Sequence, residues 1–325
     1  MDILITEDLH PAGLERLAKQ FHVVHEGAIW KDSARLKKAI GEARAILVRN
    51  QTQVTAELLG AAPKLIGIGR LGVGLDNIDL EAASKLGVVV IAPLDANATS
   101  VAEFTLGLMI ALARKVPRAD RTTKAGGWDR KGCVGMELHG KTLAICGFGR
   151  IGRLVAARAH AFGMRVLAYD PYLKADSRAL IEAGARLCEQ LEEALAEADV
   201  VSAHSPFTTR TRRMFDQRVF NLMKPGALFI NTSRGGIVDE TALLEALRSG
   251  HLRGAALDVR EVEPPVARSA FEELENVILT PHIGSFTREA QARTFEAVAA
   301  DLERLLHGAP AVNFVNFAAP RPRTV

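Results

Sequence analysis

The chain of 325 residues contains little cysteine. Its three cysteines, Cys133, Cys146 and Cys188, are odd in number, widely spaced and free of any C-x-x-C pair. This pattern argues against a disulfide framework and against a zinc site, and it indicates a reducing compartment. We therefore expect a cytoplasmic protein that binds no metal.

A large excess of one charge is also missing. Lys and Arg together number 41 against 38 Asp and Glu, which gives a formal net charge of +3. This balance makes no electrostatic case for nucleic acid. The apolar stretch at residues 101–113 carries Glu103 and is too short to span a bilayer. Because the N-terminus, MDILITEDLH, is acidic and reads as a strand, it does not resemble a targeting signal. We expect neither a nucleic-acid nor a membrane partner.

What the chain does contain is a regular alternation of strand-like and helix-like segments. Its length allows two domains, and 48% apolar and 24% charged residues are typical of a globular protein. Short β-branched runs such as DILIT, AILVRN and VVVIA alternate with segments of helical period such as PAGLERLAKQ. This alternation predicts parallel strands joined by crossover helices, an α/β fold.

The domain boundaries follow from a change after Ala92. The connector PLDANATS leads into a long apolar helix, and a fresh strand–turn–helix–strand unit begins at Lys141. The last helix, TREAQARTFEAVAADLERLLHG, is remote in sequence from the first strands, and an economical arrangement returns it to the first domain. We therefore predict a discontinuous domain over residues 1–98 and 287–325, and a second domain over 99–286.

The second domain opens with a candidate cofactor site. GFGRIG, residues 147–152, fits G-x-G-x-x-G, with the strand TLAIC before it and a helix and a second strand, RVLAYD, after it. Gly147 would allow the tight turn, Gly149 the approach of a pyrophosphate, and Gly152 the close packing of the helix on the sheet. The alternative is a plain glycine turn in an α/β domain.

An acid at the end of the second strand bears on the choice of cofactor. Asp170 follows Gly152 by 18 residues, where a carboxylate can accept hydrogen bonds from a ribose diol. The same carboxylate would repel a 2′-phosphate, and the next residues are Pro171 and Tyr172 rather than arginine. The pattern favours NAD over NADP. Asp170 could instead only form an Asp-Pro turn.

Polar residues follow four later strands of the second domain. His204 follows ADVVSA, Arg234 follows ALFINTS, Glu263 follows GAALDV within six residues, and His282 follows NVILTP. If these strands are parallel, the four side chains meet at one edge of the sheet, where ligands bind in open α/β sheets.

This set of residues suits hydride transfer to a 2-oxo acid. Arg234 can bind the substrate carboxylate bidentately, and His282 can supply a proton to the carbonyl oxygen. Glu263 beside His282 would favour the charged imidazole and fix its orientation, while Gly284 leaves room for a ligand. Each residue also has a structural interpretation. His204 and His282 could be loop or capping residues, Arg234 a helix cap, and Glu263 a solvent-facing side chain.

At this point the sequence resembles the D-isomer-specific 2-hydroxyacid dehydrogenases, which include phosphoglycerate, glyoxylate/hydroxypyruvate and formate dehydrogenases. The resemblance rests on AICGFGRIG…YDP, NTSRGGIVDE, ALDVREVEPP and LTPHIGS, in this order. RLGVGLDNID and NATSVAEFTLGLMIALAR extend it over nearly the whole chain.

The resemblance implies an NAD-dependent enzyme that transfers a hydride between nicotinamide and a small 2-hydroxy or 2-oxo acid, of D configuration. It also implies a Rossmann-type doubly wound parallel sheet for NAD and a smaller, discontinuous, flavodoxin-like α/β substrate domain. The cleft of the family closes over NADH, and its homodimer forms largely through the cofactor domain.

The family's functional residues map onto single positions of this chain. Its catalytic residues correspond to Arg234, Glu263 and His282. Its cofactor contacts correspond to Gly147, Gly149, Arg150, Ile151, Gly152, Asp170, His204, Ser233, Asp258 and Thr99, with Asp258 on the nicotinamide amide and Thr99 near the nicotinamide. Its substrate contacts correspond to Arg49, Asn50, Gly72, Val73, Gly74 and Arg234. The backbone N–H groups of residues 71–74 could form an anion nest for the substrate carboxylate.

Some features depart from the family or leave a choice open. IAPLDANATS replaces the usual connector pattern, and the substrate-facing positions match no single branch, so the acid is not named. A C-terminal regulatory domain for serine is not expected, because the chain ends at Val325. An alternative function is an NAD(H)-sensing scaffold like the corepressors of the same fold, which keep the catalytic residues. The short ends of the chain argue against this alternative.

Overall fold

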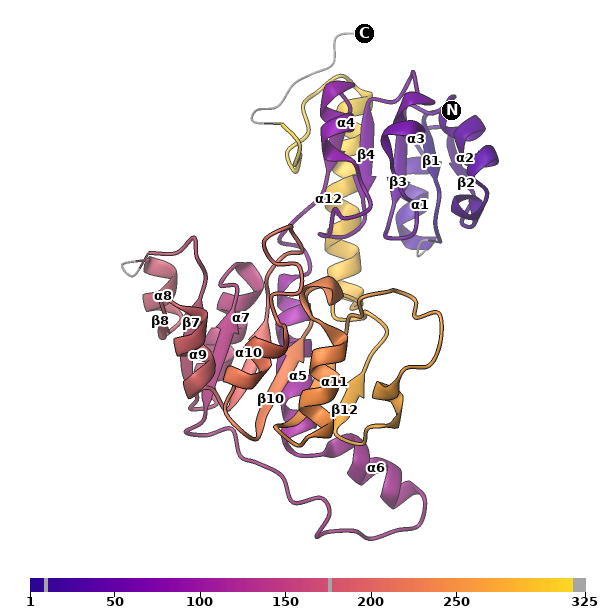
Figure 1. Cartoon of the computed structure of the whole chain (residues 1–325). Helices are drawn as coiled ribbons and strands as arrows, with labels where there is room; N and C mark the ends of the chain where they lie inside the picture. Colours follow the sequence, from indigo (N-terminus) through magenta and orange to yellow (C-terminus); the bar gives the residue numbers. More distant parts are fainter. Residues whose placement is uncertain (9–10, 175–176, 318–325) are drawn as a thin grey trace. The chain divides into compact units, whose positions relative to one another are not determined.

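The computed structural model describes residues 1–8, 11–174 and 177–317. The chain divides into two compact units. Unit 1 comprises Met1–Asn97 and Phe286–Val325, and unit 2 comprises Ala98–Ser285 (Figure 1). The chain thus leaves unit 1, forms all of unit 2 and then returns to unit 1 for its last helix.

Unit 1 contains a parallel sheet whose described strands run in the order β2-β1-β3-β4-β5. This is the flavodoxin-like order, in which the sheet reverses its direction of growth between β1 and β3. Four of the strands are buried throughout, as expected for strands covered on both faces. The strands are β1 (Ile3–Ile5), β2 (Val23–His25), β3 (Ala45–Val48), β4 (Gly67–Arg70) and β5 (Val89–Ile91).

Helices cover both faces of this sheet. The last helix of the chain packs on β4, where a Cβ atom added to Gly69 would lie 2.6 Å from Val298 Cγ1 and 2.7 Å from Leu47 Cδ2. Glycine therefore lets the helix approach the strand closely. The other face forms a second apolar core against the shorter helices. The helices are α1 (Pro11–Ala18), η1 (Ile29–Lys31), α2 (Ser33–Ile40), α3 (Ala56–Gly60), α4 (Leu80–Lys85) and α12 (Arg288–Leu306).

Unit 2 contains a larger parallel sheet, with described strands in the order β12-β11-β10-β9-β6-β7-β8. Counted from β6, this is the doubly wound Rossmann order with one further strand, and its switch point lies between β6 and β9. The strands are β6 (Thr142–Cys146), β7 (Arg165–Tyr169), β8 (Ala185–Leu187), β9 (Val200–Ala203), β10 (Ala227–Asn231), β11 (Leu252–Leu257) and β12 (Val277–Leu279).

Two apolar cores flank this sheet, and Figure 1 shows its strands with the helices around them. On one face α5, α7 and α8 pack on the strands, and on the other α9, α10 and α11 pack around Phe215, Phe220 and Phe229, whose rings meet edge to face or tilted. The helices are α5 (Ala98–Ala113), α6 (Val116–Lys124), α7 (Arg150–Ala161), α8 (Arg178–Glu182), α9 (Leu191–Glu197), α10 (Gln217–Leu222), η2 (Gly235–Ile237), α11 (Glu240–Arg248) and η3 (Ala270–Glu273).

The α/β class and the two parallel sheets predicted from the alternation of segments are confirmed. Within the described ranges, no helix has both the length and the apolar character needed to cross a membrane.

Candidate active site

The carboxyl ends of four neighbouring strands form one edge of the sheet in unit 2. Because β9, β10, β11 and β12 are parallel, the turns that follow them lie at the same edge. His204, Arg234, Glu263 and His282 lie in these turns. The four strands are therefore parallel, as the predicted convergence of these four side chains requires.

The shortest contact at this edge joins Glu263 and His282. His282 Nδ1 lies 2.6 Å from Glu263 Oε2, and Glu263 Oε1 accepts a hydrogen bond of 2.9 Å from the Arg260 N–H. Burial raises the pKa of Glu263, but the hydrogen bond and charge of His282, the Arg260 N–H and the charge of Arg234 outweigh it, so this pKa lies below its usual value. Glu263 is therefore a carboxylate at neutral pH, and each of its two oxygens has a hydrogen-bond partner.

The backbone of His282 adopts an unusual conformation, with φ of 55°. A residue other than glycine in this left-handed region is strained unless its surroundings fix it, and such residues often lie at functional sites. Here Asp258 fixes the turn. The carbonyl oxygen of Asp258 accepts from the His282 N–H at 2.8 Å, and its carboxylate accepts from the N–H groups of Ile283 at 2.9 Å and Gly284 at 2.8 Å.

Asp258 is thus an anchor for the histidine turn, a role that the sequence did not reveal. It is 1% exposed, and it also accepts a hydrogen bond of 2.6 Å from the Thr280 hydroxyl. Its expected contact with the nicotinamide amide stays a prediction. Gly284 also leaves room for this carboxylate, because an added Cβ atom would lie 3.0 Å from Asp258 Oδ2. Its room for a ligand stays a prediction.

Arg234 lies in a tight turn at the end of β10. Asn231 closes the turn, because its Nδ2 donates to Arg234 O at 2.9 Å and its Oδ1 accepts from the N–H and hydroxyl of Ser233. Arg234 holds the N-cap position of η2, but its side chain makes no capping hydrogen bond; Nη1 donates to Ser233 O at 2.7 Å. The capping interpretation of the Arg234 guanidinium is therefore wrong.

The turns that carry Arg234 and Glu263 touch through their backbones. A Cβ atom added to Gly235 would lie 1.9 Å from the carbonyl carbon and oxygen of Arg260. No side chain can fit there, so Gly235 is required for the approach of the two turns.

His204 differs from His282 in its electrostatic state. Its Nε2 lies 2.8 Å from Ser202 Oγ, and its buried Nδ1 has no hydrogen-bond partner within the described part of the chain. Burial lowers the pKa of His204 to about 4. The imidazole is neutral at pH 7, which makes His204 a poor proton donor there and leaves His282 as the better candidate.

The glycine turn of unit 2 has the geometry expected of a phosphate cradle. Gly147 has φ of 99°, and an added Cβ atom would lie 2.7 Å from His204 C and O. At Gly152 an added Cβ would lie 2.4 Å from Gly147 O, whereas at Gly149 it would meet no atom within 4 Å. Gly149 therefore faces open space at the N-terminus of α7, which begins with Arg150 and Ile151.

Asp170 lies beside this turn and forms a turn of its own. Its Oδ2 accepts from the Phe148 N–H at 2.9 Å, and its Oδ1 accepts from the Tyr172 N–H at 3.0 Å. Asp170 therefore does form an Asp-Pro turn, but its carboxylate is also fixed against the glycine turn. Its contact with a ribose stays a prediction.

In unit 1 the candidate substrate residues Arg49 and Asn50 follow β3, next to the switch point of that sheet. Glu7, which follows β1 and is 3% exposed, accepts hydrogen bonds from the backbone N–H groups of Arg49, Gln51 and Thr52. Asn77 Nδ2 donates to the carbonyl oxygens of Arg49 and Thr52. Neither residue was predicted from the sequence, although an acid directly after a buried strand was a usable signal.

The Arg49 guanidinium lies over the ring of Phe286, 4.8 Å from its centroid. Burial lowers the pKa of Arg49, and the Glu7 carboxylate opposes this effect. An arginine remains charged under such conditions, so Arg49 presents a fixed cation at the carboxyl edge of the sheet.

The loop at residues 71–74 differs from the predicted anion nest. The Leu71 N–H donates to Val48 O and the Gly72 N–H donates to Arg70 O, each at 2.9 Å. At most the N–H groups of Val73 and Gly74 remain for an anion. The loop wraps the buried Arg70 instead, whose Nε donates to Gly74 O at 2.8 Å, and a Cβ atom at Gly72 would meet its guanidinium. Arg70 was missed because it reads as the end of a strand.

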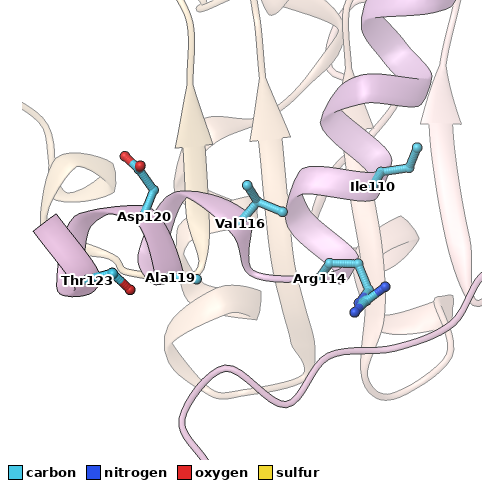
Figure 2. Close-up of a pocket in the computed structure, with 6 residues that line it drawn as sticks. All are labelled: Ile110, Arg114, Val116, Ala119, Asp120 and Thr123. Atoms are coloured by element: carbon cyan, nitrogen blue, oxygen red, sulfur yellow. The ribbon is translucent and has the colours of Figure 1, made fainter. Parts of the chain in front are cut away.

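Unit 2 also carries Thr99 and a hollow on its surface. Thr99 is exposed in the first turn of α5. Figure 2 shows a hollow along the end of α5 and along α6, lined by Ile110, Arg114, Val116, Ala119, Asp120 and Thr123. None of the predicted site residues lines it. The described residues include no group of three or more histidine, cysteine or acidic side chains that could hold a metal ion.

Comparison with known proteins decides the family. Residues 106–284 match the model of the D-isomer specific 2-hydroxyacid dehydrogenase, NAD binding domain. The chain belongs to this family. The resemblance predicted from the sequence motifs is confirmed, since the matched residues include the glycine turn and all four strand-end residues.

The similar proteins of known name or structure cover nearly the whole chain. D-3-phosphoglycerate dehydrogenase of Methanocaldococcus jannaschii is 43% identical over 97% of this chain and 59% of its own length. The TT0316 protein from Thermus thermophilus has a TM-score of 0.90 and 36% identity, covering 97% of this chain and all of the other. D-lactate dehydrogenase from Aquifex aeolicus, solved with NAD and lactic acid, has a TM-score of 0.87 and 30% identity, covering 98% of this chain and all of the other. The chain spans about three fifths of the length of the curated relatives it matches.

The half-buried, neutral imidazole of His204 predicts a pH-dependent stability. Its pKa is about 4 in the folded protein against an ordinary value of 6.5, so between these values the unfolded state binds the proton and the folded state does not. The free energy of unfolding should fall as the pH falls from about 6.5 to about 4. His204→Asn removes this titration, and its free energy of unfolding, measured in urea, should fall less over the same range. An equal fall in both proteins would contradict a neutral imidazole.

Proposed function

We propose that the protein is an NAD-dependent dehydrogenase that transfers a hydride between nicotinamide and C2 of a small 2-hydroxy or 2-oxo acid of D configuration. One observation carries this proposal: the Glu263 carboxylate holds His282 Nδ1 at 2.6 Å, at the same sheet edge as Arg234 and the glycine turn. This arrangement leaves His282 Nε2 to exchange a proton with the substrate.

The chain's own residues supply the acid–base chemistry of this reaction. In the reducing direction a hydride adds to the carbonyl carbon, and the electron pair of the broken π bond moves to the oxygen. His282 would donate a proton from Nε2 to that oxygen, and the negative charge of Glu263 would stabilise the imidazolium before the transfer. In the opposite direction the same nitrogen accepts the hydroxyl proton.

Arg234 would hold the substrate carboxylate. Its planar guanidinium can bind a carboxylate bidentately, which fixes the orientation of C2. The turn closed by Asn231 and packed on the Arg260 peptide restricts the backbone from which this side chain extends.

Several features of unit 2 fit NAD. When bound, this cofactor would donate or accept the hydride. The glycine turn and the N-terminus of α7 can hold its pyrophosphate, and the buried Nδ1 of His204 has no partner within the described residues. Arg150, Ile151, Ser233, Asp258 and Thr99 are the further cofactor residues that we propose. The fixed carboxylate of Asp170 supports NAD over NADP, because it would repel a 2′-phosphate.

We propose that unit 2 is the NAD-binding domain and unit 1 the substrate domain. The domain boundaries predicted from the sequence, 98/99 and 286/287, each lie one residue beyond a boundary of these units. Arg49, Asn50, Gly72, Val73 and Gly74 are the substrate residues that we propose in unit 1. They lie at the carboxyl ends of β3 and β4, where ligands bind in sheets of this kind.

The fixed cation at Arg49 and the names of the relatives support a substrate with a second anionic group. Relatives from archaea, bacteria and the rat are D-3-phosphoglycerate dehydrogenases. We therefore propose 3-phosphoglycerate and 3-phosphohydroxypyruvate as the first substrate pair to test.

A homodimer formed through unit 2 is also part of the proposal, as is a cytoplasmic location. The segment after α6 exposes Trp128 by 81% and Val134 by 70%, and Val116 is exposed in α6. Large apolar side chains exposed close together in sequence are typical of a surface that a partner covers.

Replacing His282 tests the catalytic assignment. His282→Asn should lower kcat for 3-phosphohydroxypyruvate reduction by roughly 10²–10⁴-fold, the usual contribution of general acid–base catalysis. The assay follows the loss of NADH absorbance, with glyoxylate, hydroxypyruvate, pyruvate and oxaloacetate in parallel and NADPH in place of NADH. His251→Asn, which alters a histidine bound to Phe220 O, is the control and should keep wild-type kcat.

Wild-type kcat in His282→Asn would contradict the acid–base role. Rates with NADPH that equal or exceed those with NADH would contradict the Asp170 argument. Tight NADH binding without turnover of any acid would favour the scaffold alternative.

Two alanine variants of the glycine turn separate cofactor binding from folding. Gly149→Ala adds a methyl group that meets no protein atom within 4 Å, so its melting temperature should match the wild type while NADH binding weakens by roughly tenfold or more. Gly152→Ala places the methyl group 2.4 Å from Gly147 O and should lower the melting temperature. Thermal unfolding and NADH fluorescence titration measure the two effects. Unchanged NADH affinity in Gly149→Ala would exclude the turn as the phosphate site.

Replacing Trp128 tests the dimer. The wild type should have twice the chain mass of 35.1 kDa in size-exclusion chromatography with light scattering, and Trp128→Ser should shift the population toward the monomer. Ile181→Ser alters an equally exposed residue on α8 and should leave the mass unchanged. A monomeric wild type would contradict this part of the proposal.

A further inference from the structure

We infer that the ion pair between Glu240 and Arg260 is a positioning device for Glu263, and through Glu263 for His282. The inference rests on the proposed function, because it concerns how the acid–base pair of that function is held. Neither Glu240 nor Arg260 belongs to the predicted catalytic set.

Glu263 needs such a device because its loop has little apolar packing to hold it. Between β11 and η3 the chain forms no regular element, and Val262 and Val266 on either side of Glu263 are exposed. A loop with few apolar contacts does not hold a side chain in one place by packing. Yet proton transfer requires the imidazole to be fixed to within about an ångström.

The loop is held in place at Arg260. Its side chain is 11% exposed and makes a bidentate pair with Glu240, from Nε to Oε1 at 2.9 Å and from Nη2 to Oε2 at 3.0 Å. The guanidinium also donates to Ser269 Oγ at 3.1 Å and lies 5.0 Å from the centroid of the Phe271 ring. A planar guanidinium with this many partners has one available orientation.

Glu240 holds the backbone beside Arg260 as well as the Arg260 side chain. Glu240 Oε1 also accepts a hydrogen bond of 2.8 Å from the Glu261 N–H, so one carboxylate holds both the side chain of Arg260 and the next peptide. On its other side, the Arg260–Glu261 peptide lies against Gly235, where no Cβ atom fits. The peptide is therefore clamped between the start of α11 and the turn after Arg234.

Arg260 links this peptide to the preceding one, Val259–Arg260, and from there the path to His282 is two hydrogen bonds long. The Arg260 N–H donates to Glu263 Oε1 at 2.9 Å, which directs Oε2 to His282 Nδ1 at 2.6 Å. If the Arg260 peptide shifts, the Glu263 carboxylate loses its fixed partner and the imidazole loses its orientation. Ion pairs of this kind add little net stability, so their main effect here is on geometry.

Arg260→Lys tests the inference, because it keeps the charge but removes the bidentate contact. This variant should keep the wild-type KM for NADH and lower kcat for the 2-oxo acid by roughly 10- to 100-fold. Arg218→Lys alters a similar arginine–glutamate pair, with Glu192 at 2.9 Å on the surface of the same unit, and should keep wild-type kcat. Glu240→Gln is the second variant should Arg260→Lys fail to fold, and it should give the same pattern.

The same substitution in a Glu263→Gln background separates positioning from general damage. If Arg260 acts through Glu263, Arg260→Lys should change kcat of the Glu263→Gln enzyme by less than about twofold, since the coupled pair is already lost. An equal fold loss in both backgrounds, or no loss in either, would overturn the inference. Failure of the proposed function would look different: the wild type would turn over no 2-oxo acid, and Glu263→Gln would change nothing.

Discussion

The candidate site depends on the hydrogen bonds that Asp258 accepts from the turn at residues 280–284. This carboxylate ends β11 and is almost inaccessible to solvent, and it accepts three hydrogen bonds from the turn after the neighbouring strand. These bonds stabilise the left-handed backbone of His282, which would otherwise be strained. Without this turn the imidazole would not be directed toward Glu263.

Glycines allow the backbones of neighbouring turns at this sheet edge to lie in contact. Gly235 lets the turn of Arg234 reach the Arg260–Glu261 peptide, and Gly147 lets the glycine turn at residues 147–152 reach His204, directly after β9. In both places a single Cβ atom would collide with main-chain atoms. The site is therefore assembled from turns packed on one another, and each turn fixes one functional side chain.

Much of this could be predicted from the sequence, because it follows from periodicity and from order along the chain. Alternating segments predicted parallel strands, and parallel strands predicted that residues following successive strands share an edge. Spacing alone was enough to pair Glu263 with His282 as a hypothesis, and the two side chains are in contact.

The contacts that position the site could not be predicted, because they depend on orientation in three dimensions. The position of Glu7 after a strand marks it as a candidate, but it does not indicate which three N–H groups, more than 40 residues away, the carboxylate accepts. No pattern in the sequence indicates that Glu240 holds the Arg260–Glu261 peptide. The predicted nest at residues 71–74 was partly wrong for the same reason, since two of its N–H groups donate to the carbonyl oxygens of Val48 and Arg70.

We propose that His282, held by Glu263 and Asp258, exchanges the proton with the substrate oxygen. A crystal structure of the protein with NAD⁺ and 3-phosphoglycerate measures this directly. We expect His282 Nε2 within about 2.6–3.2 Å of the C2 oxygen, with the Glu263 hydrogen bond intact and Arg234 on the substrate carboxylate. If the C2 oxygen is hydrogen-bonded to another group and His282 is turned away from it, His282 is not the residue that exchanges the proton.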